Sequence, residues 1–300
     1  MSYTREEMPE IHGDVLFDEP MSRRTSFRIG GTADIFAVVH DVSDLQALLK
    51  WLDERSIPVF VIGAGTNLLV ADKGIRGAVI QLGRGFQKVH VRGSEVAVGS
   101  AVKLARVMRE GIARGLAGLE FLVGIPGTVG GAVCMNAGTP EGCIRDCLAS
   151  VTALEKHGKL RSLTADELGL DYRSSNVREN GLILAGAIFH LTPKSPGEIN
   201  EIVRARLYRR RITQPPGVGT AGSVFKNPPD GFAGRMLEEA GVKGMQIGGA
   251  RVSSRHANWI ENTGAATASD VRELMQALRE LIADRFGVTL EPEIELVGEW

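Results

Sequence analysis

Apolar residues recur along the chain with two periods, which together predict helices and strands. Four leucines spaced i, i+3, i+4 and i+7 predict a helix over Asp44–Arg55. The apolar run Val59–Ile62 predicts a short strand directly after this helix. Further strands are expected at Ala78–Leu82, Lys88–Val91, Glu95–Val98, Ser150–Glu155, Leu160–Leu163, Leu182–Leu191 and Val288–Val297, and further helices at Lys103–Ile112, 196–212, Gly234–Ala240 and Ser269–Phe286. Strand and helix do not alternate regularly, so the pattern indicates an α+β fold rather than a doubly wound sheet.

Capping and turn residues bound several of these elements. Ser195-Pro196-Gly197-Glu198 is a capping box with proline at the first helical position, so it begins the helix that runs to Ile212. Gly287 ends the last helix. Gln214-Pro215-Pro216-Gly217 cannot continue a helix and is the expected domain boundary.

The composition is that of a globular protein without a nucleic-acid or membrane partner. Its 300 residues, 43% hydrophobic and 24% charged, suffice for two or three domains. A net charge of -1 argues against general binding to nucleic acid or anionic membranes. The first ten residues carry several charges and no apolar run, so no signal peptide is expected. The uncharged stretch Phe121–Pro140 has the length of a membrane span, but its glycines and prolines favour a buried loop system.

The three cysteines, Cys134, Cys143 and Cys147, form no paired C-x-x-C motif. The spacing of the last two permits a metal site, but no histidine lies close in sequence to complete one. We therefore expect free thiols, no metal and a cytoplasmic protein. The sequence carries no signal for the oligomeric state, and a monomer is the expectation.

Two glycine-rich loops are the main candidates for a binding site. The first, Gly63-Ala64-Gly65-Thr66-Asn67, follows an apolar strand and suits an anion-binding nest. Leu68 replaces the third glycine of a dinucleotide fingerprint, which disfavours a Rossmann NAD site. A plain strand–loop–strand turn remains the alternative.

The second loop runs from Gly124 to Ala132 and continues to Asn136-Ala137-Gly138. It lacks the Gly-Lys-Ser/Thr ending of a P-loop, so ATP hydrolysis is not indicated. Its many backbone N–H groups need acceptors, which a pyrophosphate and a flavin ring would supply. A close crossing of a helix over a sheet is the alternative.

Both loops resemble the FAD-binding signature of the vanillyl-alcohol-oxidase-type flavoproteins. Within that fold the chain resembles the UDP-N-acetylenolpyruvoylglucosamine reductase (MurB) family over roughly residues 20–298. The motifs that match in order are Thr25-Ser-Phe-Arg-Ile-Gly-Gly31, Gly63-Ala-Gly-Thr-Asn-Leu-Leu69, Gly124-Ile-Pro-Gly-Thr-Val-Gly-Gly131, Tyr172-Arg-Ser-Ser175, Gly222-Ser-Val-Phe-Lys-Asn-Pro228 and Glu291-Pro-Glu-Ile294.

The resemblance implies a two-subdomain FAD-binding module and an α+β substrate-binding domain. The first subdomain would span residues 1–98, with a C-terminal strand at 288–300 returning near the active site, the second 99–213, and the substrate domain 214–287. FAD would be held noncovalently, because the first loop has no histidine or cysteine, and NADPH would donate the hydride. The implied cofactor residues are Gly63, Ala64, Gly65, Thr66, Asn67, Leu68, Gly124, Ile125, Pro126, Gly127, Thr128, Gly130, Gly131, Ala132, Asn136, Ala137 and Gly138.

The family's reaction adds a hydride to C3 of the enolpyruvyl group of a UDP-sugar and a proton to C2. Ser223 matches the family's proton donor, Arg173 its catalytic arginine and Glu293 its catalytic glutamate. A fixed guanidinium suits an enolate-like carboxylate. Glu291 and Glu295 would share a strand face with Glu293, and these like charges would raise its pKa. Read without the resemblance, the three are a serine after glycine, a turn arginine and an acid on an edge strand.

Four further residues are candidate substrate contacts: Lys226 and Asn227 beside Ser223, Arg209 in a basic helix end, and His256. The segment from Leu191 to Ser223 is short, which favours the family branch without an inserted tyrosine loop. Two other functions stay open on the residues alone, an oxidase of the same fold and a flavin-binding module without catalysis.

Overall fold

The computed structural model describes residues 4–156, 158–215 and 219–300 and divides the chain into two compact units. Unit 1 comprises Met1–Phe17, Ile35–Ala64 and Gly77–Arg210, and unit 2 comprises Asp18–Asp34, Gly65–Arg76 and Arg211–Trp300. Each unit is therefore assembled from three separate stretches of sequence. The domain limits expected at residues 98 and 213 remain a prediction, and Pro216 and Gly217 of the expected boundary lie outside the described residues.

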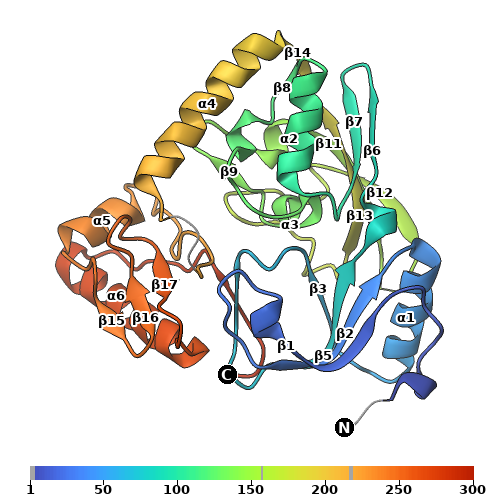
Figure 1. Cartoon of the computed structure of the whole chain (residues 1–300), viewed down its shortest axis with the longest axis horizontal. Helices are drawn as coiled ribbons and strands as arrows, with labels where there is room; N and C mark the ends of the chain where they lie inside the picture. The colour runs from blue at the N-terminus through green and yellow to red at the C-terminus, as the bar shows by residue number, and fades with distance from the viewer. Residues whose placement is uncertain (1–3, 157, 216–218) are drawn as a thin grey trace. The chain divides into compact units, whose positions relative to one another are not determined.

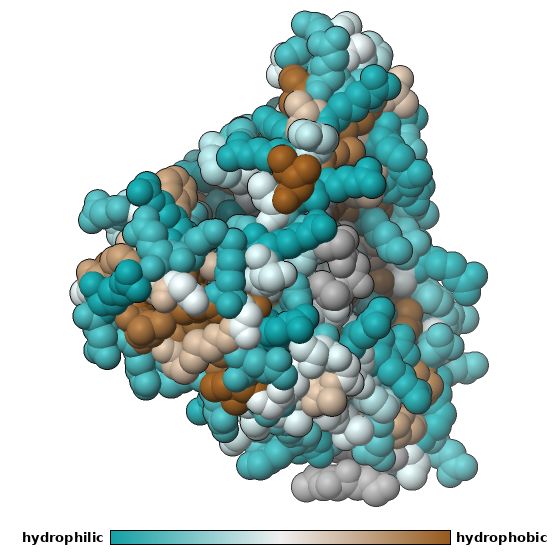
Figure 2. All heavy atoms as spheres, turned by 60° about the vertical axis from the view of Figure 1, so that its left-hand side comes forward, coloured by the Kyte–Doolittle hydropathy of each residue, from teal (hydrophilic) through white to brown (hydrophobic). Residues whose placement is uncertain are grey.

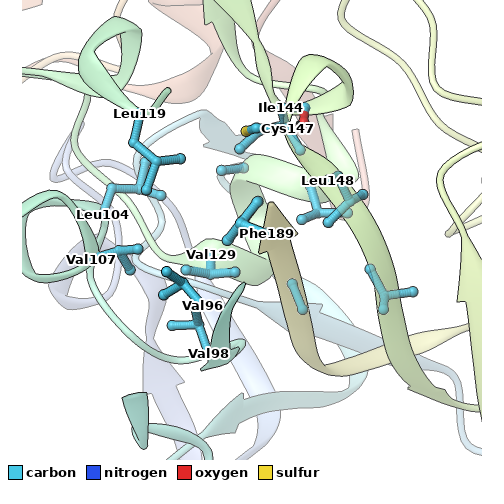
Figure 3. Close-up of a cluster of buried hydrophobic side chains, with 14 of the residues drawn as sticks. Val96, Val98, Leu104, Val107, Leu119, Val129, Ile144, Cys147, Leu148 and Phe189 are labelled. Carbon is cyan, nitrogen blue, oxygen red and sulfur yellow. Dashed lines mark hydrogen bonds between the residues drawn. The ribbon is translucent and has the colours of Figure 1, made fainter. Parts of the chain in front are cut away.

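The first sheet of unit 1 has five antiparallel strands in the order β12-β11-β13-β7-β6 (Figure 1). The strands are β6 Val89–Arg92, β7 Glu95–Gly99, β11 Leu148–Leu154, β12 Leu160–Thr164 and β13 Ile183–His190. Apolar residues of these strands pack with those of helix α2 (Leu104–Ala113) and helix α3 (Val129–Cys134) into one core (Figure 3). Phe189 and Val129 meet in this core, so the second glycine loop is anchored to the sheet.

The second sheet has the order β1-β2-β5-β3, with β3 parallel to β5. Its strands are β1 Val15–Pro20, β2 Thr32–Val39, β3 Val59–Ile62 and β5 Ile75–Leu82. Helix α1 (Val42–Glu54) begins at the N-cap Asp41 and buries Leu45, Leu48 and Leu52 completely. The helix expected from the leucine spacing is thus confirmed, as is the strand Val59–Ile62.

Unit 1 also contains a long helix and two short strand pairs. Helix α4 (Pro196–Thr213) starts at Ser195, whose hydroxyl accepts a hydrogen bond from the Glu198 N–H at 3.3 Å and donates one to its carboxylate at 2.7 Å. The strand pairs are β8 (Leu116–Ala117) with β14 (Thr192–Pro193) and β9 (Gly138–Thr139) with β10 (Gly142–Cys143). Single 3-10 turns lie in unit 1 at Arg5–Glu7, Arg84–Phe86, Glu120–Leu122 and Ile144–Asp146, and in unit 2 at Met21–Arg23.

Unit 2 contains a three-stranded antiparallel sheet and two helices. The sheet has the order β15-β16-β17, and its strands are β15 Gln246–Ile247, β16 Ala250–Val252 and β17 Ile260–Asn262. Helices α5 (Ala233–Glu239) and α6 (Ala268–Phe286) contribute buried residues to the same apolar cluster as this sheet. Gly287 ends α6 with a φ of 68°, as expected.

The C-terminal strand is much shorter than predicted. Only β18 (Glu295–Val297) is a strand, paired in parallel with β4 (Leu68–Val70). Pro292 forms an isolated bridge with Phe225, and Glu293 sits in a bend, so the expected acidic strand face over 291–295 is wrong. The residues before β18 follow the 223–226 segment instead, because Glu293 donates its N–H to the Val224 carbonyl at 2.7 Å.

The uncharged stretch Phe121–Pro140 is less buried than predicted and is not all loop. It contains α3, whose N-cap Thr128 accepts a hydrogen bond from the Gly131 N–H. Phe121 is buried, whereas Gly124, Pro126 and Gly131 are exposed. In the described part of the chain, no helix is both long and apolar enough to cross a membrane. On the face drawn in Figure 2, hydrophilic side chains predominate and hydrophobic ones form small separate groups.

Candidate active site

Gly63, the first residue of the first glycine loop, meets the second loop inside unit 1. Gly63 follows the last residue of β3, and its carbonyl accepts a hydrogen bond from Gln81 Nε2 at 2.8 Å. A Cβ atom at Gly63 would lie 2.6 Å from the Oγ1 atom of Thr128 in the second loop. Only glycine allows this approach, so one small residue brings the two loops together.

Backbone hydrogen bonds fix the path of the second loop. Val129 and Gly130 donate their N–H groups to the carbonyls of Val102 and Ser100, at 2.9 and 2.8 Å. A Cβ atom at Gly130 would meet Ser100 Cβ at 3.0 Å, which is tighter than ordinary contact. The loop is therefore held at the start of α3, while Gly124 and Gly131 on either side of this point are exposed.

Both loops have the properties that a dinucleotide requires. Gly65, Gly124 and Gly127 have φ values of 63°, 72° and 136°, which open the backbone where a side chain would be strained. Among the described residues, no protein acceptor receives the N–H groups of Ala64 or Thr128. The buried Ser100 hydroxyl also has no partner in that part of the chain. Donors without acceptors in two neighbouring glycine loops suit an anionic cofactor, so these residues fit FAD.

Arg173 lies on a tight turn of unit 1. Asp171 and Ser174 exchange backbone hydrogen bonds at 3.2 Å, which closes the turn around the arginine. Arg173 itself has a φ of 54°, an uncommon conformation for a residue other than glycine. Its guanidinium donates to the Gly138 carbonyl at 2.7 Å and lies over the Tyr172 ring. The arginine is thus attached to the end of the second glycine loop.

Ser223 lies in unit 2 on an extended segment. Asn258, which we did not predict from the sequence, holds this segment in place. Asn258 is buried, accepts the Phe225 N–H at 3.0 Å and donates to the Phe225 carbonyl at 2.8 Å. Its carbonyl also accepts the Val224 N–H at 2.9 Å. Gly222, with a φ of 85°, provides the turn that leads into Ser223. No signal in the sequence pairs Asn258 with this segment, which lies 33 residues away.

Glu293 lies directly beside the Ser223 segment. Its N–H bonds to the Val224 carbonyl, and its own carbonyl accepts a hydrogen bond from Asn67 Nδ2 at 3.0 Å. Asn67 also accepts the Glu295 N–H at 2.9 Å through its carbonyl. Unit 2 therefore brings Asn67, the Ser223 segment and Glu293 together, although they are far apart in sequence.

The four candidate substrate contacts differ in their exposure and in their bonding partners. Lys226 pairs with Glu291 at 3.5 Å, and Arg209 with Glu141 at 3.6 Å, both in accessible positions. Asn227 uses its side-chain oxygen to accept the Ala233 N–H at the start of α5. His256 packs in a turn between β16 and β17, where burial lowers its pKa, and its Nδ1 accepts the Asn258 N–H at 3.2 Å. A neutral histidine with this contact fits a structural role better than an anion contact.

Candidate metal ligands are occupied by structural contacts. All three cysteines are free thiols, and burial raises the pKa of Cys147 to about 12, so it remains protonated near neutral pH. Among the described residues, one set of potential ligands lies close together, namely His12, Asp41 and Asp44. Asp41 caps α1, and Asp44 accepts the His12 N–H at 2.6 Å, so both carboxylates already serve the start of this helix.

Comparison with known proteins first defines the class. Residues 33–164, which contain both glycine loops, match the FAD-binding domain family, and residues 214–297 match the C-terminal domain of UDP-N-acetylenolpyruvoylglucosamine reductase. The fold is similar to 6-hydroxy-D-nicotine oxidase from Arthrobacter nicotinovorans, with a TM-score of 0.50 at 15% identity over 93% of this chain and 65% of that one. Fold and site thus define an FAD-binding oxidoreductase of mixed α and β structure.

Closer relatives then define the family. The reductases of Desulforamulus reducens and Moorella thermoacetica are 41% and 42% identical, covering 96% and 95% of this chain and 95% and 94% of theirs. The crystal structure of the Thermus caldophilus reductase (MurB) has a TM-score of 0.83 at 34% identity and covers 96% of this chain and all of that one. The chain belongs to the UDP-N-acetylenolpyruvoylglucosamine reductase family, and the resemblance seen in its motifs is confirmed.

Proposed function

We propose that the chain reduces UDP-N-acetylglucosamine enolpyruvate to UDP-N-acetylmuramate, with FAD as cofactor, NADPH as hydride donor and Ser223 as proton donor. Family membership supports the substrate and both cofactors. The observation that carries the residue roles is the hydrogen bond from the Glu293 N–H to the Val224 carbonyl, which places the glutamate beside the serine segment. An oxidase role has less support, because the oxidase likeness extends to the fold alone.

FAD, held by the two glycine loops, would supply the hydride for C3 of the enolpyruvyl group, with NADPH as the source of the electrons. Charge then moves toward C2 and the neighbouring carboxylate. In this proposal Ser223 Oγ donates the proton to C2. The Asn258 clamp keeps the serine's backbone fixed, and the hydroxyl makes no hydrogen bond with the described residues. A fixed donor loses little entropy when the proton is transferred.

Arg173 and Glu293 would assist this proton transfer. The Arg173 guanidinium is always charged and planar, so it suits the carboxylate on which negative charge develops. Its hydrogen bond to the Gly138 carbonyl fixes the direction of the guanidinium. Glu293 would orient the donor and restore its proton.

Lys226 and Arg209 would contact the anionic parts of the UDP-sugar. Their ion pairs with Glu291 and Glu141 are long and accessible, so exchanging either carboxylate for a phosphate costs little. Asn227 and His256 would act indirectly, by shaping the substrate side of unit 2. Helix α4 occupies much of the segment from Leu191 to Ser223, which supports the branch without the inserted tyrosine loop. Free thiols support a cytoplasmic location, and a monomer remains our expectation.

An anaerobic experiment in two steps tests this function. The purified protein should show a flavin spectrum, which NADPH should bleach. Addition of UDP-N-acetylglucosamine enolpyruvate should then restore the oxidised spectrum with formation of UDP-N-acetylmuramate. Reoxidation by oxygen at a rate that exceeds reoxidation by the substrate would contradict the proposal and favour an oxidase.

Glycine at position 131 should matter for FAD rather than for folding. A Cβ atom there meets only Thr128 Oγ1 at 3.6 Å, an ordinary contact, and alanine is the better helix former by about 1 kcal/mol. We expect Gly131→Ala to keep the stability of the cofactor-free protein and to weaken FAD binding about tenfold, or about 1.4 kcal/mol. Fluorescence titration with FAD measures the affinity. Gly197→Ala is the matched control, because no atom lies within 4 Å of a Cβ atom at this helical glycine, and unchanged affinity in both variants would remove Gly131 from the FAD site.

A further inference from the structure

Asn136 lies at the end of the second glycine loop and is buried, with only 4% of its surface exposed. Both ends of its side-chain amide form hydrogen bonds with other groups of the protein. Nδ2 donates to the Asp171 carbonyl at 2.9 Å, and Oδ1 accepts the Arg145 N–H at 3.0 Å. Both ends of this buried amide are thus held by partners within the protein.

The carbonyl that Asn136 holds belongs to the turn that carries Arg173. Asp171 O is also the acceptor that closes this turn from the Ser174 N–H. One bond from Asn136 therefore fixes the turn two residues before the guanidinium-bearing residue. Because Arg173 has a positive φ, the turn stays in place only while its surroundings hold it there.

Three further bonds tie the same two segments together. Ser175 Oγ donates to the Cys134 carbonyl at 2.6 Å, and Arg145 Nη1 donates to the Leu170 carbonyl at 3.0 Å. The Arg173 guanidinium itself ends on the Gly138 carbonyl. The turn is thus fastened before, at and after Arg173, and Asn136 supplies the central buried bond.

The backbone at Asn136 agrees with this role. Its φ of 40° turns the chain out of α3 and toward β9, which contains Gly138. Asparagine tolerates this conformation better than most side chains. The backbone of Asn136 thus leads the chain toward Gly138, whose carbonyl accepts from Arg173. Its side chain at the same time bonds to the turn that contains Arg173.

We infer that Asn136 is a positioning residue for Arg173, which acts on the reaction by fixing the Asp171–Ser174 turn rather than by contacting FAD. The inference rests on the proposed function, because it assigns Asn136 to the step that uses Arg173. It predicts a defect in delivery of the hydride and proton to the substrate, with FAD binding and reduction of FAD by NADPH preserved.

Asn136→Asp is the appropriate substitution. Aspartate also tolerates a positive φ and keeps an acceptor for the Arg145 N–H. It replaces the N–H that faces the Asp171 carbonyl by an oxygen, so attraction becomes repulsion. We expect substrate-driven reoxidation of reduced flavin to slow about 10²-fold, the cost of a small misplacement of a reacting group. Asn180→Asp, at an exposed position of the same unit, adds the same charge away from the turn and should have no effect.

Stopped-flow measurement of each half-reaction, with an FAD titration, separates the possible roles. A fall in FAD affinity with normal reoxidation of bound flavin would make Asn136 a cofactor ligand and overturn the inference, as would normal rates in both half-reactions. Equal slowing of both half-reactions would also overturn it, because this would indicate a general structural role. If the aspartate variant does not fold, Asn136→Gly keeps the positive φ without strain, and Ser175→Ala removes a neighbouring anchor of the same turn.

A double-mutant cycle with Arg173→Lys provides the decisive readout. If Asn136 acts through Arg173, Asn136→Asp should slow reoxidation far less in the lysine background than in the wild type. Multiplying effects would show that the two residues act independently and would overturn the inference. The wild-type arm tests the proposed function separately, since a wild-type protein that the UDP-sugar cannot reoxidise would contradict that function whatever Asn136 does.

Discussion

Replacing Ser223 by alanine is expected to slow the overall reaction about 10²- to 10⁴-fold, the range for loss of a positioned general acid. FAD binding and bleaching by NADPH should be unchanged. The substitution removes only a hydroxyl, since the Asn258 bonds that clamp this segment all go to backbone atoms of Val224 and Phe225. NADPH consumption at steady state and reoxidation of prereduced enzyme by the UDP-sugar measure the effect.

Ser254→Ala is the control for this variant, because Ser254 is an exposed serine of the same unit. It should behave as the wild type in each assay. Near-normal turnover by Ser223→Ala would remove the serine from the mechanism and would leave water as the proton source. Loss of FAD along with activity would instead indicate damage to the cofactor site.

Replacing Arg173 by lysine is expected to slow substrate reduction about 10²- to 10³-fold, the cost of losing one preorganised stabilising donor. Lysine keeps the positive charge, but it lacks the planar fork that can bond to Gly138 and to a carboxylate at the same time. The backbone strain at φ 54° is common to both residues and does not distinguish them. Comparison of kcat and KM for the UDP-sugar, together with the rate of flavin reduction, checks this prediction.

Arg161→Lys is the matched control. Arg161 lies on β12 of the same unit and forms a partly exposed ion pair with Glu155. It should leave both half-reactions unchanged. A lysine variant at position 173 that reduces its substrate as fast as the wild type would show that charge alone is enough. It would also remove the reason for fixing the turn so tightly.

Periodic apolar positions allowed much of the fold to be predicted. The leucine face of α1 and the apolar run of β3 each depend on local pattern and are confirmed. The C-terminal strand failed for a physical reason. Alternation alone predicted a strand from Val288, but pairing with β4 begins only at Glu295, after Pro292 and a bend at Glu293. Local pattern does not reveal which neighbour a strand will find.

The candidate site was predictable only where motifs identified it. Ser223 and Glu293 lie in no periodic pattern, and only the motifs suggested that they lie close together. The hydrogen bond between the Glu293 N–H and the Val224 carbonyl supports this suggestion. The buried asparagines Asn136 and Asn258 show the limit of this approach. Each holds a segment that is distant in sequence, and a single sequence contains nothing that pairs an amide with a backbone carbonyl far along the chain.

The pairing of β18 with β4 has a consequence for the folding of the protein during its synthesis. Leu69 of β4 is fully buried in unit 2, and its partner in the sheet is Leu296, more than 200 residues later in the sequence. A ribosome must therefore add all of these residues before this apolar strand is covered. Until then the nascent chain presents an unpaired sheet edge, the type of surface that chaperones recognise. Translation that stops before β18 would leave this strand edge unpaired and favour aggregation.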